Sequence, residues 1–286
     1  MASLRDIRKR IKSVKNTQKI TKAMKMVAAA KLRRAQEAAA AAQHYADGYR
    51  HLVQSLAAMV DAGDHKLLAE RPDAQRATVI VLTSSRGLCG GFNSNLLKQL
   101  GRFMAAEGAA YDEVSVVTIG SKGAGHVARR YQHEADLTSA FVDGDEVEES
   151  RQLIQRLAQS FVAGELDHVY VLYNRFVSVM TQEPTLTRML PTQLPEEAED
   201  LEVQVLIEPD SQTLLDHVLE QQLFLTLYQA VLDTEAGEHA SRMTAMDGAT
   251  KNAGEMIDKM TLIYNRARQA AITSELVEII SGAEAL

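Results

Sequence analysis

The sequence predicts an α/β fold in which a Rossmann-like domain is inserted between two long helices that pair as an antiparallel coiled coil. Residues 4–60 and 211–281 carry apolar side chains at helical spacing. The chain between them alternates short β-branched runs with helical stretches. All five prolines lie outside the two terminal stretches, and proline interrupts a helix interior. The predicted divisions are a helix at 1–62, an α/β domain at 75–193, a linker or foot at 194–210 and a helix at 211–286.

The N-terminal helix has a start signal and a stop signal. Ser3 followed by Asp6 resembles a capping box, and Gly63 ends the pattern. At 1.5 Å per residue this helix is roughly 85 Å long. Its apolar stripe recurs at steps of three and four and continues to Met59, beginning with Leu4, Ile7, Ile11, Val14, Ile20, Met24, Val27, Ala28, Leu32 and Ala35.

The C-terminal helix follows Pro209, with Asp210 and Ser211 as possible N-caps, and is on the order of 100 Å long. Two helices of this length need packing partners, and an inserted domain makes antiparallel pairing the simplest geometry. Polar interruptions at Gln18, Thr21, Lys31 and Thr250 predict an imperfect coil whose exposed faces meet other proteins. The C-terminal stripe comprises Leu214, Val218, Leu225, Leu232, Ala236, Ala240, Met243, Met246, Ala253, Ile257, Met260, Tyr264, Ala267 and Ala271.

The middle of the chain has the pattern of a buried parallel sheet. Three short apolar runs predict strands at Ala77–Thr83, Val114–Gly120 and His168–Tyr173. Residues 174–190 predict a further extended pair, and 191–200 an acidic linker with prolines. Helices that could serve as crossovers are predicted near 93–106, 122–131 and 146–162.

The charge is unevenly distributed. The chain carries a net charge of −7, yet its first 34 residues hold twelve Lys and Arg against Asp6 alone. This asymmetry predicts an acidic partner for the N-terminal helix, which could be a protein, a nucleic acid or a membrane surface. The single cysteine, Cys89, excludes an internal disulfide and favours a reducing compartment. No apolar run approaches the roughly 18–20 residues of a membrane span, so no membrane insertion is expected.

The glycine-rich segments do not match known nucleotide-binding motifs. Residues 87–91 (GLCGG) and 120–125 (GSKGAG) each follow a predicted strand, but neither has the spacing of a dinucleotide or Walker A loop. Both predict tight strand-to-helix turns, with Cys89 a small buried residue instead of a nucleophile. Residues 143–149 lack the ligand spacing of a calcium loop and predict a solvated loop and helix start. No catalytic, cofactor or metal site is therefore expected, and the chain is predicted not to be an enzyme.

Residue patterns alone leave a second class of function open. The basic helix could belong to a coiled-coil adaptor or a nucleic-acid-binding protein. Its basic residues occupy several faces without interleaved aromatics, however, and the chain as a whole is acidic. A protein partner is therefore favoured.

Three segments resemble the gamma subunit of F-type ATP synthases, the central rotor stalk. They are RDIRKRIKSVKNTQKITKAMKMVAAAKLRR at 5–34, SSRGLCGGFNSN at 84–95, and the region 240–282 that contains ASRMTAMDGATKNA and YNRARQAAITSELVEIISGA. With the α/β segment, the resemblance covers essentially the whole chain. It implies a shaft inside a hexameric ring of alpha and beta subunits, which couples proton flow through the c-subunit ring to ATP synthesis or hydrolysis. The epsilon subunit is a further implied partner, and nucleic acid is not.

The resemblance also implies roles for individual residues. Met24 falls where the family's shaft passes an acidic lever of the catalytic subunits. The foot that faces the c ring and epsilon would include Leu206, Ile207 and Glu208. Contacts with the ring of alpha and beta subunits are implied for Arg242, Arg268, Gln269, Thr273 and Glu275.

Two differences from other members of this family indicate which type of organism the protein comes from. The cysteine pair of chloroplast relatives is missing, and no transit extension precedes the first helix, so a bacterial protein is expected. Its expected location is peripheral, on the cytoplasmic face of the bacterial plasma membrane. The longer C-terminal helix is expected to reach further than its partner, with Arg268–Glu275 near its single-helix tip.

Overall fold

A computed structural model describes residues 3–59, 65–142, 146–193 and 210–284. The chain forms two compact units: unit 1 comprises Met1–Ala29 with Arg242–Leu286, and unit 2 comprises Ala30–Ser241. Two long helices contribute to both units, α1 (Leu4–Met59) and α6 (Ser211–Glu284). Both helices were predicted. The predicted foot residues Leu206, Ile207 and Glu208 lie outside the described residues.

The first turn of each long helix is capped by the residues that the sequence suggested. The amide of Asp6 donates to Ser3 Oγ at 3.2 Å, and the Ser3 hydroxyl donates to Asp6 Oδ2 at 2.8 Å. At the start of α6 the amide of Thr213 donates to Asp210 Oδ1 at 2.9 Å. Such caps satisfy amides that have no partner inside the helix.

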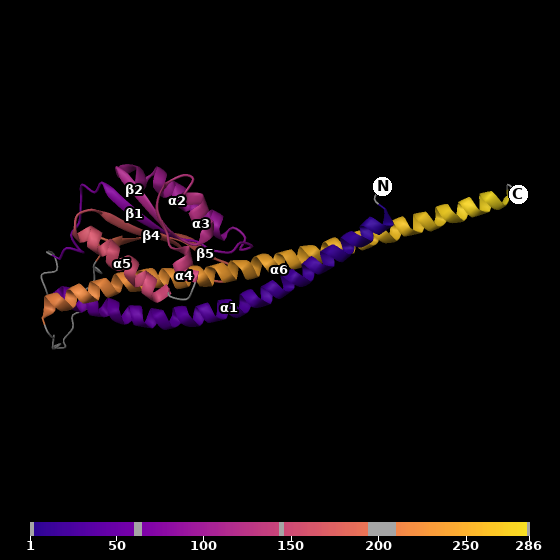
Figure 1. The fold of residues 1–286 in the computed structure, drawn as a ribbon. Helices are drawn as coiled ribbons and strands as arrows, with labels where there is room; N and C mark the ends of the chain where they lie inside the picture. Colours follow the sequence, from indigo (N-terminus) through magenta and orange to yellow (C-terminus); the bar gives the residue numbers. More distant parts are fainter. Residues whose placement is uncertain (1–2, 60–64, 143–145, 194–209, 285–286) are drawn as a thin grey trace. The chain divides into compact units, whose positions relative to one another are not determined.

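Unit 2 contains a five-stranded sheet in the order β3-β2-β1-β4-β5 (Figure 1). Strands β1 to β4 run parallel, and β5 pairs antiparallel with β4 through a hairpin. The three predicted strands are present, whereas residues 174–190, predicted as a further extended pair, form the end of β4, a turn and one further strand, β5. The strands are β1 (Arg76–Leu82), β2 (Glu113–Ile119), β3 (Gln132–Asp136), β4 (His168–Phe176) and β5 (Gln182–Leu190).

Shorter helices cover both faces of this sheet, with α2 and α3 on one side and α5 on the other (Figure 1). The α2 side buries Val79, Leu96 and Phe103. The predicted helix at 122–131 is shorter than expected, because α3 ends at Val127. The bounds are α2 (Phe92–Ala105), η2 (Glu107–Ala110), α3 (Ser121–Val127), α4 (Thr138–Val142) and α5 (Glu146–Val162).

The opposite face of the sheet packs on the parts of α1 and α6 that belong to unit 2. Ile80 and Phe161 share one core with Val53 of α1 and with Leu219 and Leu227 of α6. All five side chains are at most 1% exposed. Burying such side chains contributes about 1.5–3 kcal/mol each, so these helix segments are an integral layer of the α/β unit.

His65 and Leu67 tie two elements of unit 2 together. His65 Nε2 lies 2.5 Å from Asp216 Oδ1 of α6, and the His65 Nδ1 atom accepts the amide of Leu67 at 3.2 Å. The carbonyl of Leu67 accepts the amide of Thr192 just beyond β5, at 2.9 Å. The start of α6 is therefore held to the end of the sheet.

Candidate functional site

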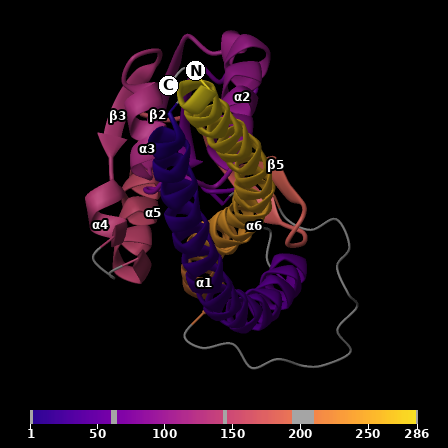
Figure 2. The same cartoon turned by 90° about the vertical axis from the view of Figure 1, so that its right-hand side faces the viewer.

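The pairing of α1 with α6 in unit 1 is antiparallel, as predicted (Figure 2). Arg8 donates to the hydroxyl of Tyr264 at 2.5 Å, and the hydroxyls of Thr21 and Thr250 are 2.7 Å apart. Further along, Lys25 Nζ lies 2.6 Å from Asp247 Oδ1. Residue numbers rise on one helix as they fall on the other, which fixes both direction and register.

The seam between the helices follows a heptad pattern. Its positions alternate in steps of three and four, the spacing of a left-handed coiled coil. On α1 the buried or half-buried seam residues are Leu4, Ile7, Ile11, Val14, Gln18, Thr21, Lys25 and Ala28. On α6 they are Met246, Thr250, Ala253, Ile257, Met260, Tyr264, Ala267 and Ala271.

Within unit 1, the predicted apolar stripe of α1 was wrong at two positions. Ile20 and Val27 are 60% and 59% exposed, so they do not face α6. The side chains that lie in the seam are instead the polar Gln18 and Thr21, which the sequence pattern treated as interruptions. The heptad register explains the error, because it places Ile20 and Val27 one position outside the pairs that meet the other helix.

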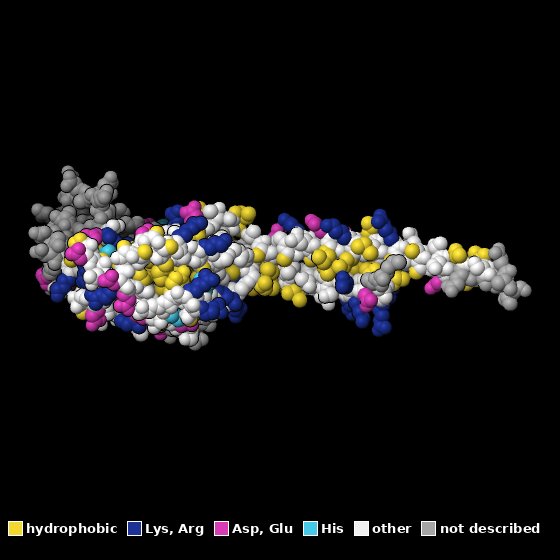
Figure 3. Space-filling model, turned by 90° about the horizontal axis from the view of Figure 1, so that it is seen from above, with side chains coloured by type: hydrophobic (Ala, Val, Ile, Leu, Met, Phe, Trp, Pro, Cys, Tyr) yellow, Lys and Arg dark blue, Asp and Glu magenta, His cyan; other side chains and the backbone are white. Residues whose placement is uncertain are grey.

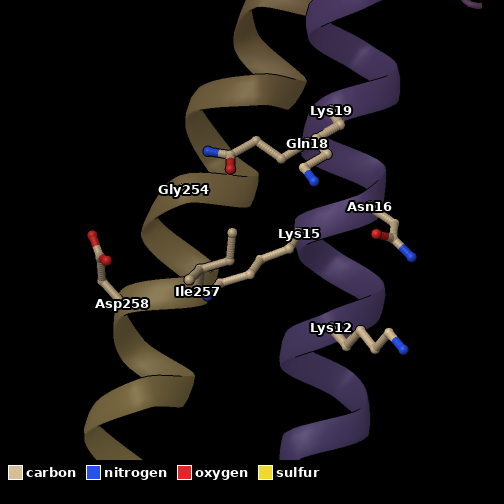
Figure 4. Close-up of a pocket in the computed structure, with 8 residues that line it drawn as sticks. All are labelled: Lys12, Lys15, Asn16, Gln18, Lys19, Gly254, Ile257 and Asp258. Carbon is tan, nitrogen blue, oxygen red and sulfur yellow. The ribbon is translucent and has the colours of Figure 1, made fainter.

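One flank of the coil is a basic groove of about 580 Å³. Lys12, Lys15 and Lys19 line it from α1, and Asp258 is the acidic residue in its lining. Figure 4 shows Lys15 reaching from α1 toward Ile257 of α6. The remaining lining residues are Asn16, Gln18, Gly254 and Ile257. Three ammonium groups against one carboxylate make this groove attractive to an acidic partner.

The opposite flank of α1 is apolar. Helical spacing places Ile20, Met24 and Val27 together, away from Lys12 and Lys19. Met24 is half-buried beside the seam and belongs to this apolar flank. Figure 3 shows hydrophobic side chains interspersed with Lys and Arg along the face of the coil that it displays.

The end of α6 extends past the first described turn of α1. The register places Leu4, the first helical residue of α1, opposite Ala267, so later residues of α6 have no described segment of α1 beside them. Arg268, Gln269, Thr273 and Glu275 are all exposed here within two to three turns. The same segment exposes a set of large apolar side chains: Ile272, Leu276, Val277, Ile279 and Ile280.

Arg242 differs from the other predicted contact residues because it is only 8% exposed. An arginine buried to this degree presents little of its side chain to another subunit. The structure therefore does not bring Arg242 together with the exposed set at Arg268–Glu275.

In an open α/β sheet of this strand order, ligands bind outside the carboxyl ends of the strands where the order reverses, between β1 and β4. Here Phe92 occupies that position and is 3% exposed, and its carbonyl accepts Asn174 Nδ2 of β4 at 3.3 Å. The predicted turn at 87–91 is present, with positive φ angles at Leu88 (64°) and Gly90 (57°). Phe92 is therefore packed at the carboxyl end of β1, beside β4.

Cys89 is a buried turn residue, as predicted. It is 3% exposed, and its Sγ accepts Asn93 Nδ2 at 3.4 Å. The same Asn93 accepts the amide of Ser84 through Oδ1 at 3.0 Å. These bonds stabilise the turn after β1, and the role of Cys89 is therefore structural.

The second glycine segment also forms a turn. Gly120 has φ of 109°, and a β-carbon there would lie 2.0 Å from the carbonyl oxygen of Thr83. The amide of Gly123 donates to Thr83 Oγ1 at 2.8 Å. Glycine is therefore required where β2 turns into α3.

Among the described residues, no group of three or more His, Cys, Asp or Glu side chains could hold a metal ion. Within the same residues, no helix is both long and apolar enough to cross a membrane. A smaller pocket of about 230 Å³ lies at the amino ends of β1 and β2. Its polar groups bond to one another, as in the pairs Thr78–Ser115 at 2.9 Å and Ser115–Glu134 at 2.8 Å.

These features define a class of protein: a two-helix coiled coil with an inserted Rossmann-like domain. Its basic groove and its exposed apolar side chains suit contacts with other proteins. The ATP synthase family model matches residues 3–286. The chain is 47% identical over 292 residues to the ATP synthase gamma chain of Trichlorobacter lovleyi, covering 100% of this chain and 99% of the relative. It is 45% identical to that of Paracoccus denitrificans, with both chains fully covered. The chain belongs to the ATP synthase gamma chain family, and the adaptor or nucleic-acid-binding alternative is not favoured.

Solved structures share the fold. The rotor of the Euglena gracilis mitochondrial ATP synthase matches with a TM-score of 0.62 at 18% identity, over 94% of this chain and 98% of that one. A chain of the OSCP/F1/c-ring structure from the same organism matches with a TM-score of 0.64 at 19% identity, over 99% and 94%. The sequence had indicated the family, its motifs and the polar seam positions Gln18, Thr21 and Thr250, but its apolar stripe wrongly included Ile20 and Val27.

Proposed function

We propose that this chain is the central-stalk rotor subunit of a bacterial F-type ATP synthase, transmitting rotation between a c-subunit ring and the catalytic subunits. The full-length identity to bacterial gamma chains is the observation that carries this proposal. The similar solved chains come from structures described as a rotor and as OSCP/F1/c-ring assemblies. Alpha, beta, epsilon and c subunits are therefore the expected partners.

Within this function the coil of unit 1 contacts the surrounding ring. The basic groove at Lys12, Lys15 and Lys19 suits an acidic segment of a catalytic subunit. Met24 lies on the apolar flank, on the other side of the seam from this groove, and is proposed to pass the same lever. The end of α6 exposes four polar or charged side chains beside five large apolar ones. This exposure supports a contact between the end of α6 and the ring through Arg268, Gln269, Thr273 and Glu275.

Two further parts of the proposal concern the foot and Arg242. Leu206, Ile207 and Glu208 are proposed to face the c ring and epsilon from their place in the foot that the family resemblance implies. Arg242 acts on the ring through the backbone and neighbours that it orders, because its own side chain is 8% exposed.

The chain supplies no catalytic group in this proposal. Phe92 is packed at the carboxyl end of β1, the edge at which such an α/β sheet would take a nucleotide, and this supports a role in transmission alone. The complex is placed at the cytoplasmic face of the bacterial plasma membrane, with this subunit peripheral.

Co-expression tests the proposal. With alpha and beta subunits the chain should purify as a stable ATPase complex, whereas the isolated chain should hydrolyse no ATP. Turnover by the isolated chain, or failure to join the ring, would contradict it.

A further inference from the structure

The seam of the unit 1 coil is polar in its middle and apolar toward the ends of the helices. The central residues are Gln18, Thr21 and Lys25 of α1 with Asp247 and Thr250 of α6, here called the polar block. On its outer side, the layers Val14–Ile257 and Ile11–Met260 are apolar. This arrangement is unusual for a pair of helices whose association depends on buried apolar surface.

Specific contacts hold the polar block together across the two helices. The hydroxyls of Thr21 and Thr250 lie 2.7 Å apart, and Thr21 is 8% exposed. Each hydroxyl is also within bonding distance of a carbonyl of its own helix, that of Gln18 or Met246. Each hydroxyl carries one proton, so in this register one threonine donates to the other; in a shifted register each hydroxyl could still donate within its own helix, but the interhelical bond would be lost.

A charged contact lies one turn away. Asp247 receives Lys25 Nζ from α1 at 2.6 Å and Lys251 Nζ from its own helix at 2.9 Å. On the other side of the threonines, the Gln18 amide lies against Gly254, where an added β-carbon would be 3.2 Å from Nε2 (Figure 4). The Lys25–Asp247 and Gln18–Gly254 contacts, like the threonine pair, depend on one relative position of the helices, whereas the Lys251–Asp247 pair lies within α6.

The polar block discriminates between registers where the apolar layers do not. Sliding α1 by one heptad, about 10 Å at 1.5 Å per residue, would place Ile11 opposite Ala267 and Val14 opposite Tyr264. Those layers would remain apolar or aromatic.

The same slide breaks the central contacts. Thr21 would face Ile257, Thr250 would face Ala28, and Lys25 would face Ala253 without a carboxylate. A polar group in a coiled-coil seam that loses its partner disfavours that register, while the correct register gains less stability than an apolar seam would give. The block is thus suited to specifying register.

We infer that the polar block is a register lock for unit 1, which adds to the packing of both helices in unit 2 and prevents α1 from sliding along α6, so that the two helices carry torque as one body. Its members are positioning residues, since they act by holding the helices that other subunits contact. The inference rests on the proposed function for its role in torque, although the lock itself is a property of the chain alone.

Disulfide trapping in the full chain tests the lock. With Cys89 replaced by Ala, Ile11→Cys is combined with Met260→Cys, the residue opposite it, or with Ala267→Cys, one heptad away. The native block should give at least tenfold more cross-link with Met260→Cys. The variant T21V/K25M/D247L/T250V should bring the two yields to within about threefold. An unchanged preference in that variant would overturn the inference.

The matched control is T21S/T250S, which keeps the hydroxyl pair and should keep the tenfold preference. Thermal unfolding separates register from simple loss of structure. The apolar variant should unfold at the same temperature as the parent or a higher one. Equal yields accompanied by a lower unfolding temperature would show a weakened coil and would also overturn the lock.

The role in torque is tested in the assembled complex. Proton pumping per ATP hydrolysed should fall at least twofold with the apolar block and recover with T21S/T250S. Unchanged pumping despite lost register would overturn the link to torque. Failure of the parent chain to join the ring would refute the proposed function and leave the trapping result intact, so the two failures are distinguishable.

Discussion

A β-carbon added to Gly237 of α6 would lie 2.9 Å from Cε2 of Phe92, the first residue of α2. It would also lie 3.3 Å from Cγ of Gln182 on β5. Real β-carbons do not approach other atoms so closely. The helix can therefore pack this tightly against the α/β part of unit 2 only with glycine at this position.

Gly237→Ala should consequently destabilise unit 2. Phe92 is 3% exposed and has little room to move, and overpacking of this kind typically costs about 1–3 kcal/mol. Urea unfolding of the full chain measures the loss. Gly248→Ala is the matched control in the same helix, because nothing lies within 4 Å of its added β-carbon. It should stabilise by roughly 0.5–1 kcal/mol, and equal effects of the two changes would contradict the packing argument.

Met24→Lys should reduce coupling in the assembled complex. Lys15 and Lys19 already make the groove on the opposite flank basic. A further ammonium on the apolar flank would strengthen a contact with an acidic lever that must be broken at each step. Proton pumping per ATP should fall while ATP hydrolysis persists. Met24→Leu keeps the apolar flank and should leave coupling unchanged; a loss there would point to packing instead of charge.

The fold could be predicted largely because its signals are periodic. The helical stripes of α1 and α6 and the buried runs of β1, β2 and β4 each follow from hydrophobic spacing. Strand β3 was missed because its sequence, QHEAD, alternates exposed and half-buried residues at the sheet edge and contains no β-branched side chain. An edge strand needs no continuous apolar run, so the pattern carried no signal.

The candidate site was predictable to a lesser degree. Sequence motifs led to the exposed set at Arg268–Glu275, but periodicity could not decide whether Thr21 or Ile20 faced α6. That choice depends on the partner helix, because the hydroxyl of Thr21 is satisfied by Thr250, which lies 229 positions along the chain. The burial of Arg242 could not be predicted from a sequence motif either, because it arises from tertiary packing.

Acid should weaken unit 2 partly through His168. Burial lowers the pKa of His168, with the nearby Arg188 guanidinium acting in the same direction. Its Nε2 is buried without a hydrogen-bond partner, while Nδ1 lies 2.6 Å from the Tyr111 hydroxyl. The folded state therefore favours the neutral imidazole. The resulting stability is present above the unfolded value of about 6.5 and is lost as the pH falls from there toward the lowered folded pKa.

His168→Gln should accordingly show a smaller loss of unfolding free energy between pH 7.5 and pH 5.5 than the parent chain. Denaturant unfolding at the two pH values measures this difference. His217→Gln, at an exposed position of α6, should retain the parent's pH dependence. An identical dependence in all three proteins would show that His168 does not contribute.

Arg71→Met should be strongly destabilising, because Arg71 joins a loop to the end of α5 and the start of β4. Its Nη1 donates to Asp167 Oδ1 at 3.0 Å and to the carbonyl of Leu166 at 2.7 Å, and its guanidinium lies 4.0 Å from the centre of the Phe161 ring. Methionine keeps the apolar contact but leaves a largely buried carboxylate with fewer donors. A loss of about 2–4 kcal/mol is expected.

The pH dependence identifies the carboxylate as the cause. Burial alone would raise the pKa of Asp167, but the amides of Arg76 and Gln75, together with Arg71, outweigh it and hold that pKa below its ordinary value. This stability is present above the unfolded value of about 3.9 and is lost as the pH falls through the lowered folded pKa. The penalty of Arg71→Met should therefore shrink between pH 7 and pH 3.5 in denaturant unfolding. Arg71→Lys keeps the charge but loses the second nitrogen of the guanidinium fork, so its penalty at pH 7 should be smaller than that of methionine. A penalty equal to that of methionine would assign the effect to guanidinium geometry instead.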